Sequence, residues 1–351
     1  MPGTSAHSST PSLGLPPLYC PLAPSSHPEA DTIDKRAAQW MDRCPIPDDP
    51  EDRAGLLGSR SAAFVANSSP QGYVDRLEAT GRWFFYAFAM DDWFESCASP
   101  HEVIDVCAAM QRALEAPDEA LSDTPFMPAY LDIVRTFRGF ATPVQYGRVT
   151  AGYRIYHQSI PWEMSYRLRG RLPDLNTQLV LRLGVSGFEA FFAMIEVCNG
   201  QEMTAREYDD PALRALREIA GLLLLWINDL SSFAKDARAG DGQNNLVIGL
   251  MNELRCPKGQ AVVQAIGIWN RSMALFIRLR DQLAAHASPQ LGHFLTDLGN
   301  MVANVVHWHR DNPRYAMAAP ALEVTTTPPP GLDPAPLPYP SIAWWWQHLT
   351  P

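Results

Sequence analysis

The chain has 351 residues, of which 46% are hydrophobic and 19% are charged, so it is long and apolar enough to bury a large core. Its 28 basic and 38 acidic residues give a formal net charge of −10, which would repel the phosphates of nucleic acids and anionic membrane surfaces. Generic nucleic-acid binding is therefore disfavoured, whereas a local cluster of carboxylates could still capture an anion through divalent cations.

Prolines separate the two ends of the chain from its middle. About half of the 31 prolines lie near the ends, and proline lacks the amide hydrogen that a helix needs. We therefore expect an extended or mobile Pro/Ser-rich segment at 1–30, one α-helical domain at 31–318 and a Pro-rich tail at 319–351. Three consecutive tryptophans begin at Trp344, and we expect them to dock on the body or on another subunit.

The middle region has the periodicity of helices. Apolar residues recur three and four apart, β-branched alternation is rare, and breaks occur at Pro, Gly, Asn and Asp. Several segments are apolar nearly all round, which is typical of the interior of a large bundle, and no phosphate-binding glycine loop follows a strand. The sequence therefore predicts an all-α fold. The predicted helices span 71–96, 101–115, 143–168 with an interruption at Pro161, 174–198, 211–238, 246–254, 258–287 and 290–309.

The chain carries no signal for export or membrane insertion. Its start lacks a basic segment followed by an apolar block, and no apolar stretch approaches the roughly 20 residues of a membrane span. The cysteines show no CxxC pair and no zinc-type spacing, so we expect free thiols and a soluble cytoplasmic protein without an integral membrane segment. The cysteines in question are Cys20, Cys44, Cys97, Cys107, Cys198 and Cys256.

The first cluster of polar residues ends an apolar, aromatic helix. The sequence FFYAFAMDDWFES places Asp91, Asp92 and Glu95 after a buried stripe. Asp91 and Glu95 are four residues apart and share a helix face, so their carboxylates can converge. Acids this close have raised pKa values unless cations lie between them, and Mg²⁺ suits such oxygen ligands. The alternative is a solvated helix end with ordinary surface acids.

The second cluster lies in LLLLWINDLSSFAKDARAGDGQNNLV. Asn228, Ser232 and Asp236 follow one another at intervals of four residues, which stacks them on one helix face. This column offers an amide oxygen, a hydroxyl and a carboxylate to a single hard cation, and Lys235 beside it could contact an anionic ligand of that cation. The alternative is that Asn and Ser satisfy each other or the backbone inside a core.

The third cluster, HWHRDNPRY, closes the last predicted helix with Arg314 and Tyr315. Arginine offers a planar donor fork that suits phosphate, and tyrosine adds a neutral hydroxyl donor. Such a pair has no diagnostic value by itself.

Together the three clusters resemble the motifs of the class I terpene synthases, most closely those of the microbial single-domain type. DDWFE resembles the DDxxE motif, NDLSSFAKD the NSE motif in its form ending in Asp, and PRY the terminal Arg-Tyr pair; 137 residues separate Asp91 from Asn228, and 86 more lead to Arg314. The resemblance covers roughly residues 20–316. It implies the α-helical bundle domain of that family and a terpene cyclase that ionises farnesyl diphosphate, cyclises it to a sesquiterpene hydrocarbon or alcohol, and releases diphosphate.

The resemblance also implies a set of metal ligands. Asp91 would be the principal Mg²⁺ ligand of the first motif, and Glu95 a more distant one. Asn228, Ser232 and Asp236 would together hold one Mg²⁺. Three Mg²⁺ ions are expected, and Mn²⁺ would be able to substitute for them.

Further roles follow from the same resemblance for the diphosphate. Lys235, Arg314 and Tyr315 would grip it, Asp92 would orient Arg314, and Arg182 stands where the family keeps a diphosphate-sensing arginine. After Arg182 the chain reads RLGVSG, which departs from the family's small polar or acidic linker followed by glycine. The carbonyl that helps to trigger ionisation would therefore belong to Val185, Ser186 or Gly187, and we assign Ser186 as the substrate contact.

Aromatic side chains would stabilise the carbocation that remains after diphosphate leaves. Helical phase suggests Phe84 and Phe88, and the resemblance suggests Trp308, six residues before Arg314. Plain core packing is the alternative for each of them. No role is assigned to the histidines of the apolar helices, namely His157, His307 and His309.

Other functions remain as alternatives. A C10 or C20 prenyl diphosphate could replace the C15 substrate. A chain-elongating prenyltransferase would carry a second DDxxD where this chain has NDLSSFAKD. A non-catalytic bundle that binds prenyl ligands or partner proteins would have no reason to align Asn, Ser and Asp in an apolar helix. A homodimer is consistent with the resemblance.

Overall fold

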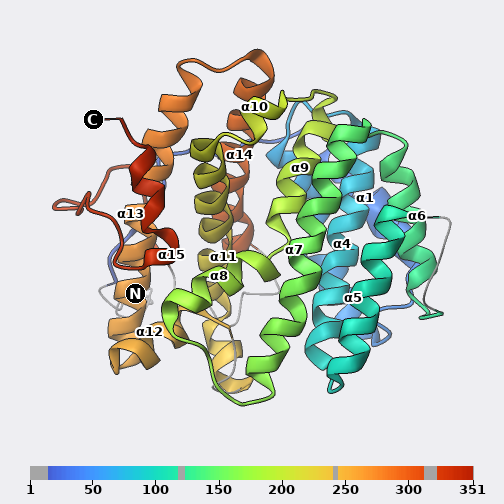
Figure 1. Cartoon of the computed structure of the whole chain (residues 1–351), viewed down its shortest axis with the longest axis horizontal. Helices are drawn as coiled ribbons and strands as arrows, with labels where there is room; N and C mark the ends of the chain where they lie inside the picture. Colours follow the sequence, from blue (N-terminus) through green and yellow to red (C-terminus); the bar gives the residue numbers. More distant parts are fainter. Residues whose placement is uncertain (1–14, 118–122, 240–243, 312–321, 351) are drawn as a thin grey trace, which may run out of the picture.

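The computed structural model describes residues 15–117, 123–239, 244–311 and 322–350, which form a bundle of long helices that run roughly side by side (Figure 1). The helices of the first half are α1 (Ala30–Trp40), α2 (Pro50–Gly58), α3 (Ser61–Ser68), α4 (Val74–Ser96), α5 (Pro100–Glu115), α6 (Met127–Arg138) and α7 (Pro143–Arg167). Those of the second half are α8 (Leu175–Val185), α9 (Phe188–Asn199), α10 (Ala205–Tyr208), α11 (Pro211–Ala239), α12 (Leu246–Leu254), α13 (Lys258–Ala284), α14 (Pro289–Asp311) and α15 (Pro340–Ala343). The described residues also form two 3₁₀ turns, Met41–Arg43 and Trp344–His348. Two parallel strands of two residues each are present as well, β1 (Leu18–Tyr19) and β2 (Val324–Thr325).

The all-α prediction is confirmed, and the long predicted helices agree closely with the structure. One exception is Pro161, which does not interrupt α7: the helix runs unbroken from Pro143 to Arg167. Its N-terminus is fixed by a capping box between Thr142 and Gln145, and it packs against α5, α8 and α9 along its length. This packing outweighs the hydrogen bond that proline cannot donate.

The helix predicted at 174–198 is two helices. Ser186 ends α8, and Gly187 starts α9 with a φ of +66°, a left-handed conformation that glycine adopts without strain. Gly184 lies within α8 and serves packing instead, because a Cβ at this position would lie 2.1 Å from the Ser159 hydroxyl oxygen on α7. The chain therefore turns sharply beside Ser186.

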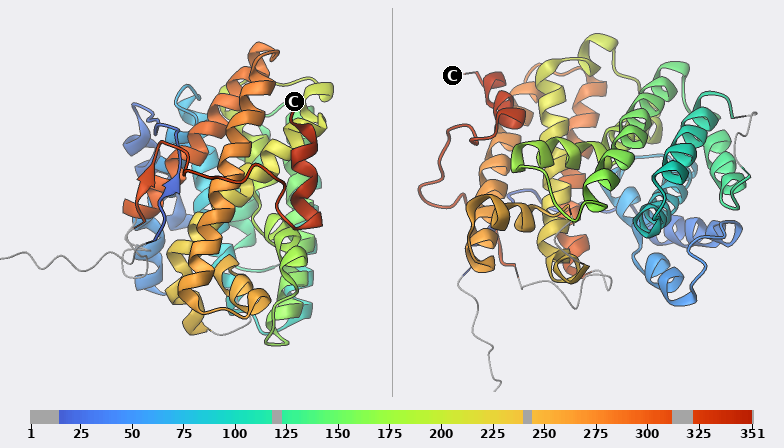
Figure 2. Two further views of the ribbon diagram at one scale, coloured as in Figure 1. Left: turned by 90° about the vertical axis from the view of Figure 1, so that its left-hand side faces the viewer. Right: turned by 60° about the horizontal axis from the view of Figure 1, so that its bottom comes forward.

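The C-terminal segment returns to the helical body. β2 pairs with β1 through Leu18 N–H, which donates to Glu323 O at 2.8 Å. The segment then passes across α13, as Figure 2 shows, where the Arg271 guanidinium donates to backbone carbonyls of the tail. Trp345 is fully buried, and its indole N–H donates to Glu218 Oε2 on α11 at 2.9 Å, so the expected docking is confirmed for this tryptophan.

Two further sequence expectations concern the chain as a whole. All six cysteines have free thiols, as expected. Within the described ranges, no helix combines the length and the apolar character that crossing a membrane requires.

Candidate active site

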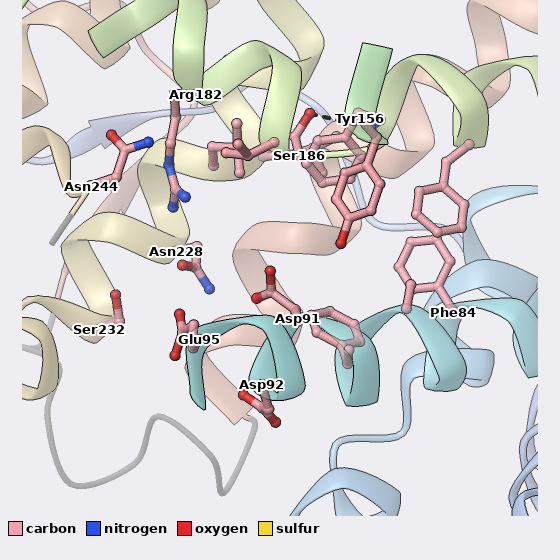
Figure 3. A pocket seen from close by; sticks show the side chains of 18 of the residues that line it. Phe84, Asp91, Asp92, Glu95, Tyr156, Arg182, Ser186, Asn228, Ser232 and Asn244 are labelled. Carbon is pink, nitrogen blue, oxygen red and sulfur yellow. Dashed lines mark hydrogen bonds between the residues drawn. The ribbon is translucent and has the colours of Figure 1, made fainter. Parts of the chain in front are cut away.

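A cavity of about 230 Å³ lies between the helices of the bundle, bordered by side chains of α3, α4, α7, α9, α11 and α14 and by the α8–α9 break. Figure 3 shows its labelled polar residues gathered around Asn228, with Phe84 away from them. The cavity thus combines a polar side that carries most of the charge with an aromatic side.

The aspartate-rich motif forms one polar wall. Asp91 and Glu95 lie on the face of α4 that looks toward Asn228, whereas Asp92 borders the cavity but points away (Figure 3). Asp91 is accessible to water within the cavity, yet protein surrounds it. This burial, reinforced by the negative charges of Glu95 and Glu163, raises the pKa of Asp91 to about 8, which Arg182 only partly opposes. A cation at this position would relieve that repulsion.

Arg167 fixes the end of α4 that carries this motif. The Arg167 guanidinium, at the end of α7, donates to the carbonyl oxygens of Phe94 at 2.9 Å and Cys97 at 3.4 Å. These carbonyls belong to the end of a helix, where intrahelical donors run out. Sequence reasoning did not find Arg167, because nothing in its local pattern links α7 to α4.

The predicted column on α11 forms the opposite polar wall. Asn228, Ser232 and Asp236 all border the cavity. The Ser232 hydroxyl donates to Asp236 Oδ2 at 2.6 Å, and the same oxygen accepts a hydrogen bond from Asn245 Nδ2 at 2.8 Å. The contact between Ser232 and Asp236 confirms that the four-residue spacing brings these oxygens together.

His309 orients the amide of Asn228. The two ring nitrogens of His309 face Val305 O at 2.9 Å and Asn228 Nδ2 at 3.3 Å. Since Val305 O can only accept, Nδ1 carries the proton and Nε2 accepts from the Asn228 amide. Burial lowers the pKa of His309 to about 4, which keeps the ring neutral. The amide oxygen of Asn228, the atom that suits a cation, therefore lies on the side opposite His309.

These donors fit hard divalent cations. Within the described part of the chain, no three His, Cys, Asp or Glu side chains gather closely enough to hold a metal ion by themselves. The acids that border the cavity are divided among α4, α7 and α11, so a cation on either wall would complete its shell with Asn or Ser oxygens, water and an anionic ligand. Carboxylate, amide and hydroxyl oxygens are the donors that Mg²⁺ uses in this manner.

Arg182 lies above the two walls and is held by Asp229. The Arg182 guanidinium donates to Asp229 Oδ1, while Asp229 Oδ2 accepts from Leu246 N–H at 2.9 Å. Asp229 is 1% exposed, and burial raises its pKa to about 6 against the opposing effect of Arg182. Among the described residues nothing accepts a hydrogen bond from the buried Arg182 Nε, and the Arg182 side chain borders the cavity.

Three further polar residues of the cavity were not predicted, namely Tyr156, Glu163 and Asn244. Asn244, just before α12, donates from Nδ2 to Glu163 Oε1 on α7 at 2.7 Å. Its amide oxygen is buried and has no partner within the described ranges. Tyr156 points its hydroxyl into the cavity on the side of Asp91 (Figure 3).

The break between α8 and α9 also faces the cavity. Val185, Ser186 and Gly187 all border it. The Ser186 hydroxyl donates to Leu183 O at 2.7 Å and accepts from Phe188 N–H at 3.2 Å, so this side chain caps the break. Which of the three residues contacts a substrate stays a prediction.

The aromatic side contains the three predicted side chains. The ring of Phe84 lies 5.9 Å from that of Phe88, and Phe88 stacks on Trp308 with centroids 6.2 Å apart. Phe84 also contacts Phe191 of α9 at 4.0 Å. Three predicted site residues cannot be placed: Arg314 and Tyr315 lie outside the described residues, and so does the side chain of Lys235.

The sequence is similar to a known protein family and to characterised enzymes over most of its length. Residues 82–274 match the family described as terpene synthase family 2, C-terminal metal binding. Spiroviolene synthase from Streptomyces violens is 32% identical over 350 residues, which cover 95% of this chain and 97% of that enzyme. The (+)-T-muurolol synthase ((2E,6E)-farnesyl diphosphate cyclizing) from Streptomyces clavuligerus is 27% identical over 344 residues, which cover 95% of this chain and 82% of that enzyme.

A solved structure has the same fold over nearly the full length. The crystal structure of the SVS_A2 protein from ancestral sequence reconstruction matches with a TM-score of 0.84 and 32% identity. The match covers 95% of this chain and 98% of that one.

Proposed function

We propose that this chain, which belongs to the terpene synthase family and is a terpene cyclase acting on a prenyl diphosphate, takes farnesyl diphosphate as its substrate. The product would be a cyclic C15 hydrocarbon or alcohol, with release of diphosphate. The farnesyl chain length is supported by the printed activity of the muurolol synthase relative.

One observation carries the proposal. The motif around Asp91 and the column from Asn228 to Asp236 border one cavity from different helices, and aromatic rings line another side of that cavity. An acidic protein gains from such an arrangement only if cations and an anion are held between the walls. The aromatic side then receives the apolar part of the same ligand.

The metal would be Mg²⁺, held by Asp91 with Glu95 on one wall and by Asn228, Ser232 and Asp236 on the other. When bound, the ions neutralise the negative charge that the departing diphosphate develops. Arg182 would donate to the diphosphate from its guanidinium group, which Asp229 holds in place. Lys235, Arg314 and Tyr315 would add donors, and Asp92 would orient Arg314.

After diphosphate leaves, the reaction depends more on keeping water away from the carbocation than on a catalytic base. Loss of diphosphate leaves an allylic cation, and the faces of Phe84, Phe88 and Trp308 would stabilise it through their quadrupoles. Exclusion of water then decides whether the cation cyclises and loses a proton or is captured as an alcohol. A carbonyl of Val185, Ser186 or Gly187 would contact the diphosphate end of the substrate, with Ser186 assigned as the contact residue.

The test is direct incubation with each candidate substrate. The protein is mixed with Mg²⁺ and geranyl, farnesyl or geranylgeranyl diphosphate, and the extracts are analysed by gas chromatography and mass spectrometry. We expect cyclic C15 products from farnesyl diphosphate. Preferred turnover of the C10 or C20 substrate would correct the chain length, longer linear diphosphates would indicate elongation, and no turnover would refute the proposal.

Two variants test the metal walls. Asp91→Ala and Asn228→Ala should each abolish turnover while circular dichroism stays helical, because each removes an oxygen donor from a different wall. Turnover near the parent level in both would remove this assignment of ligands.

A further inference from the structure

A second pocket lies behind the aromatic side of the cavity. It is formed where the N-terminal segment crosses α2, α3 and α14, and its rim at Pro24, Gly58 and Arg60 is exposed to solvent. Its volume is about 390 Å³, which leaves room for several water molecules. The residues that line it are Pro24, Ser25, Gly58, Ser59, Arg60, Ala63, Phe64, Asn67, Asn304, His307 and Trp308.

Most of the surface of this pocket is apolar, and polar groups of Ser25, Asn67 and Asn304 form part of its wall. Ser25 and Asn304 exchange two hydrogen bonds, from Ser25 N–H to Asn304 Oδ1 and from Asn304 Nδ2 to Ser25 Oγ, both at 3.1 Å. The Ser25 hydroxyl also donates to Asn67 O at 2.5 Å. These polar groups pair with one another, while the exposed rim at Pro24, Gly58 and Arg60 connects the pocket to solvent. The pocket therefore provides a place for water close to the cavity in which a carbocation would form.

A wall of two aromatic rings separates the pockets. Among the described residues, Phe64 of α3 and Trp308 of α14 are the ones that border both. Their ring centroids are 5.7 Å apart at an interplanar angle of 45°, and Phe64 also contacts Phe84 at 5.9 Å. The Trp308 ring is held in place from the side of the second pocket, because its indole N–H donates to Ser59 O at 2.8 Å.

We propose that Phe64 is a specificity-determining residue: with Trp308 it keeps the water of the second pocket out of the cyclisation cavity. This inference rests on the proposed function. Without the Phe64 ring, water would reach the cation, its oxygen would form a C–O bond with the cationic carbon, and one of its protons would leave to solvent. The product is an alcohol, and no oxidant or reductant is needed.

Phe191 supplies a matched control for Phe64. Both rings are 6% exposed, both contact Phe84, and both border the cavity, but Phe191 does not border the second pocket. Phe64→Ala and Phe191→Ala thus enlarge the cavity by the same side-chain volume, while Phe64→Ala alone opens it toward the second pocket. Phe64→Leu removes less volume and carries the test if the alanine variant does not fold.

The experiment compares parent and variants with the preferred prenyl diphosphate and Mg²⁺ in water enriched in ¹⁸O, using mass spectrometry of the products. We expect labelled alcohols that the parent does not make to become a major fraction in Phe64→Ala, to rise less in Phe64→Leu, and to stay near the parent level in Phe191→Ala.

Two results would overturn the inference while leaving the proposed function intact. One is turnover by the Phe64 variants without new labelled alcohols. The other is an equal rise in Phe191→Ala, which would attribute the capture to cavity enlargement alone. A parent that consumes no prenyl diphosphate would instead refute the proposed function, and this inference with it.

Discussion

Replacing Asp229 by Asn tests how Arg182 is held. Asp229 accepts from two donors at once, the Arg182 guanidinium on Oδ1 and Leu246 N–H on Oδ2, inside a site that is 1% exposed. An amide has the same shape but only one acceptor oxygen. If that oxygen stays with Leu246, its NH₂ group faces the guanidinium, and two donors oppose each other.

The expected loss in rate follows from that mismatch. A hydrogen bond to a charged group contributes about 1.5–3 kcal/mol, and a displaced Arg182 would forfeit one such bond to the leaving diphosphate. Because each 1.36 kcal/mol corresponds to a factor of ten, Asp229→Asn should lower kcat/KM by about 10- to 150-fold. The leftover buried donor should also lower the free energy of unfolding by about 1–3 kcal/mol.

The assay is diphosphate release from farnesyl diphosphate, read against urea unfolding of the same preparations. Asp297→Asn is the control, since Asp297 is also buried and accepts from Asn199 Nδ2 at 2.7 Å but does not border the cavity. Its stability should fall while kcat/KM stays near the parent value. A folded Asp229→Asn enzyme within twofold of the parent, or equal losses in both variants, would refute the reasoning.

Three other predictions follow from contacts described above. His309→Ala should raise the Mg²⁺ concentration needed for half-maximal activity about 10- to 100-fold, because the Asn228 amide loses the acceptor that orients it. An unchanged half-saturation concentration would contradict this. Burial lowers the pKa of His157 from about 6.5 in the unfolded chain to about 3 in the folded protein. Between pH 6.5 and pH 3 only the unfolded chain binds the proton, so the free energy of unfolding falls as the pH falls, by up to about 1.4 kcal/mol per pH unit. His157→Asn should flatten that slope in urea unfolding between pH 5 and 7, and an unaltered slope would count against it. Trp345→Ala should cost about 3–5 kcal/mol of unfolding free energy, more than the same change at half-buried Trp346; equal costs would show that burial is not the cause.

The sequence predicted the site residues well where polar side chains recur at a regular spacing along one helix. Asn228, Ser232 and Asp236 could be predicted as one face because their four-residue spacing lies inside an unbroken apolar pattern. The same holds for Asp91 and Glu95. Length and periodicity likewise predicted most of the long helices, whereas α1, α2, α3 and α6 were not among the predicted ranges.

What the sequence could not supply are contacts between distant helices. Asp229 stands beside Asn228 in the motif, but its pairing with Arg182 depends on how α8 crosses α11. His309 received no role because a histidine on an apolar helix is usually structural, and only the fold places it against Asn228. The capping of α4 by Arg167 is of the same kind. Pro161 shows the converse, since tertiary packing overrode a strong local signal.

The pairing of β1 with β2 has a consequence for how the protein is made. Leu18 is synthesised 305 residues before its hydrogen-bond partner Glu323, so the two can pair only after Glu323 has left the ribosome. Glu218 on α11 is likewise synthesised long before Trp345, which donates a hydrogen bond to it. Every described residue that borders the cavity lies before residue 312 and is therefore synthesised before Glu323 and Trp345. These two contacts therefore form only after the described residues that border the cavity have been synthesised.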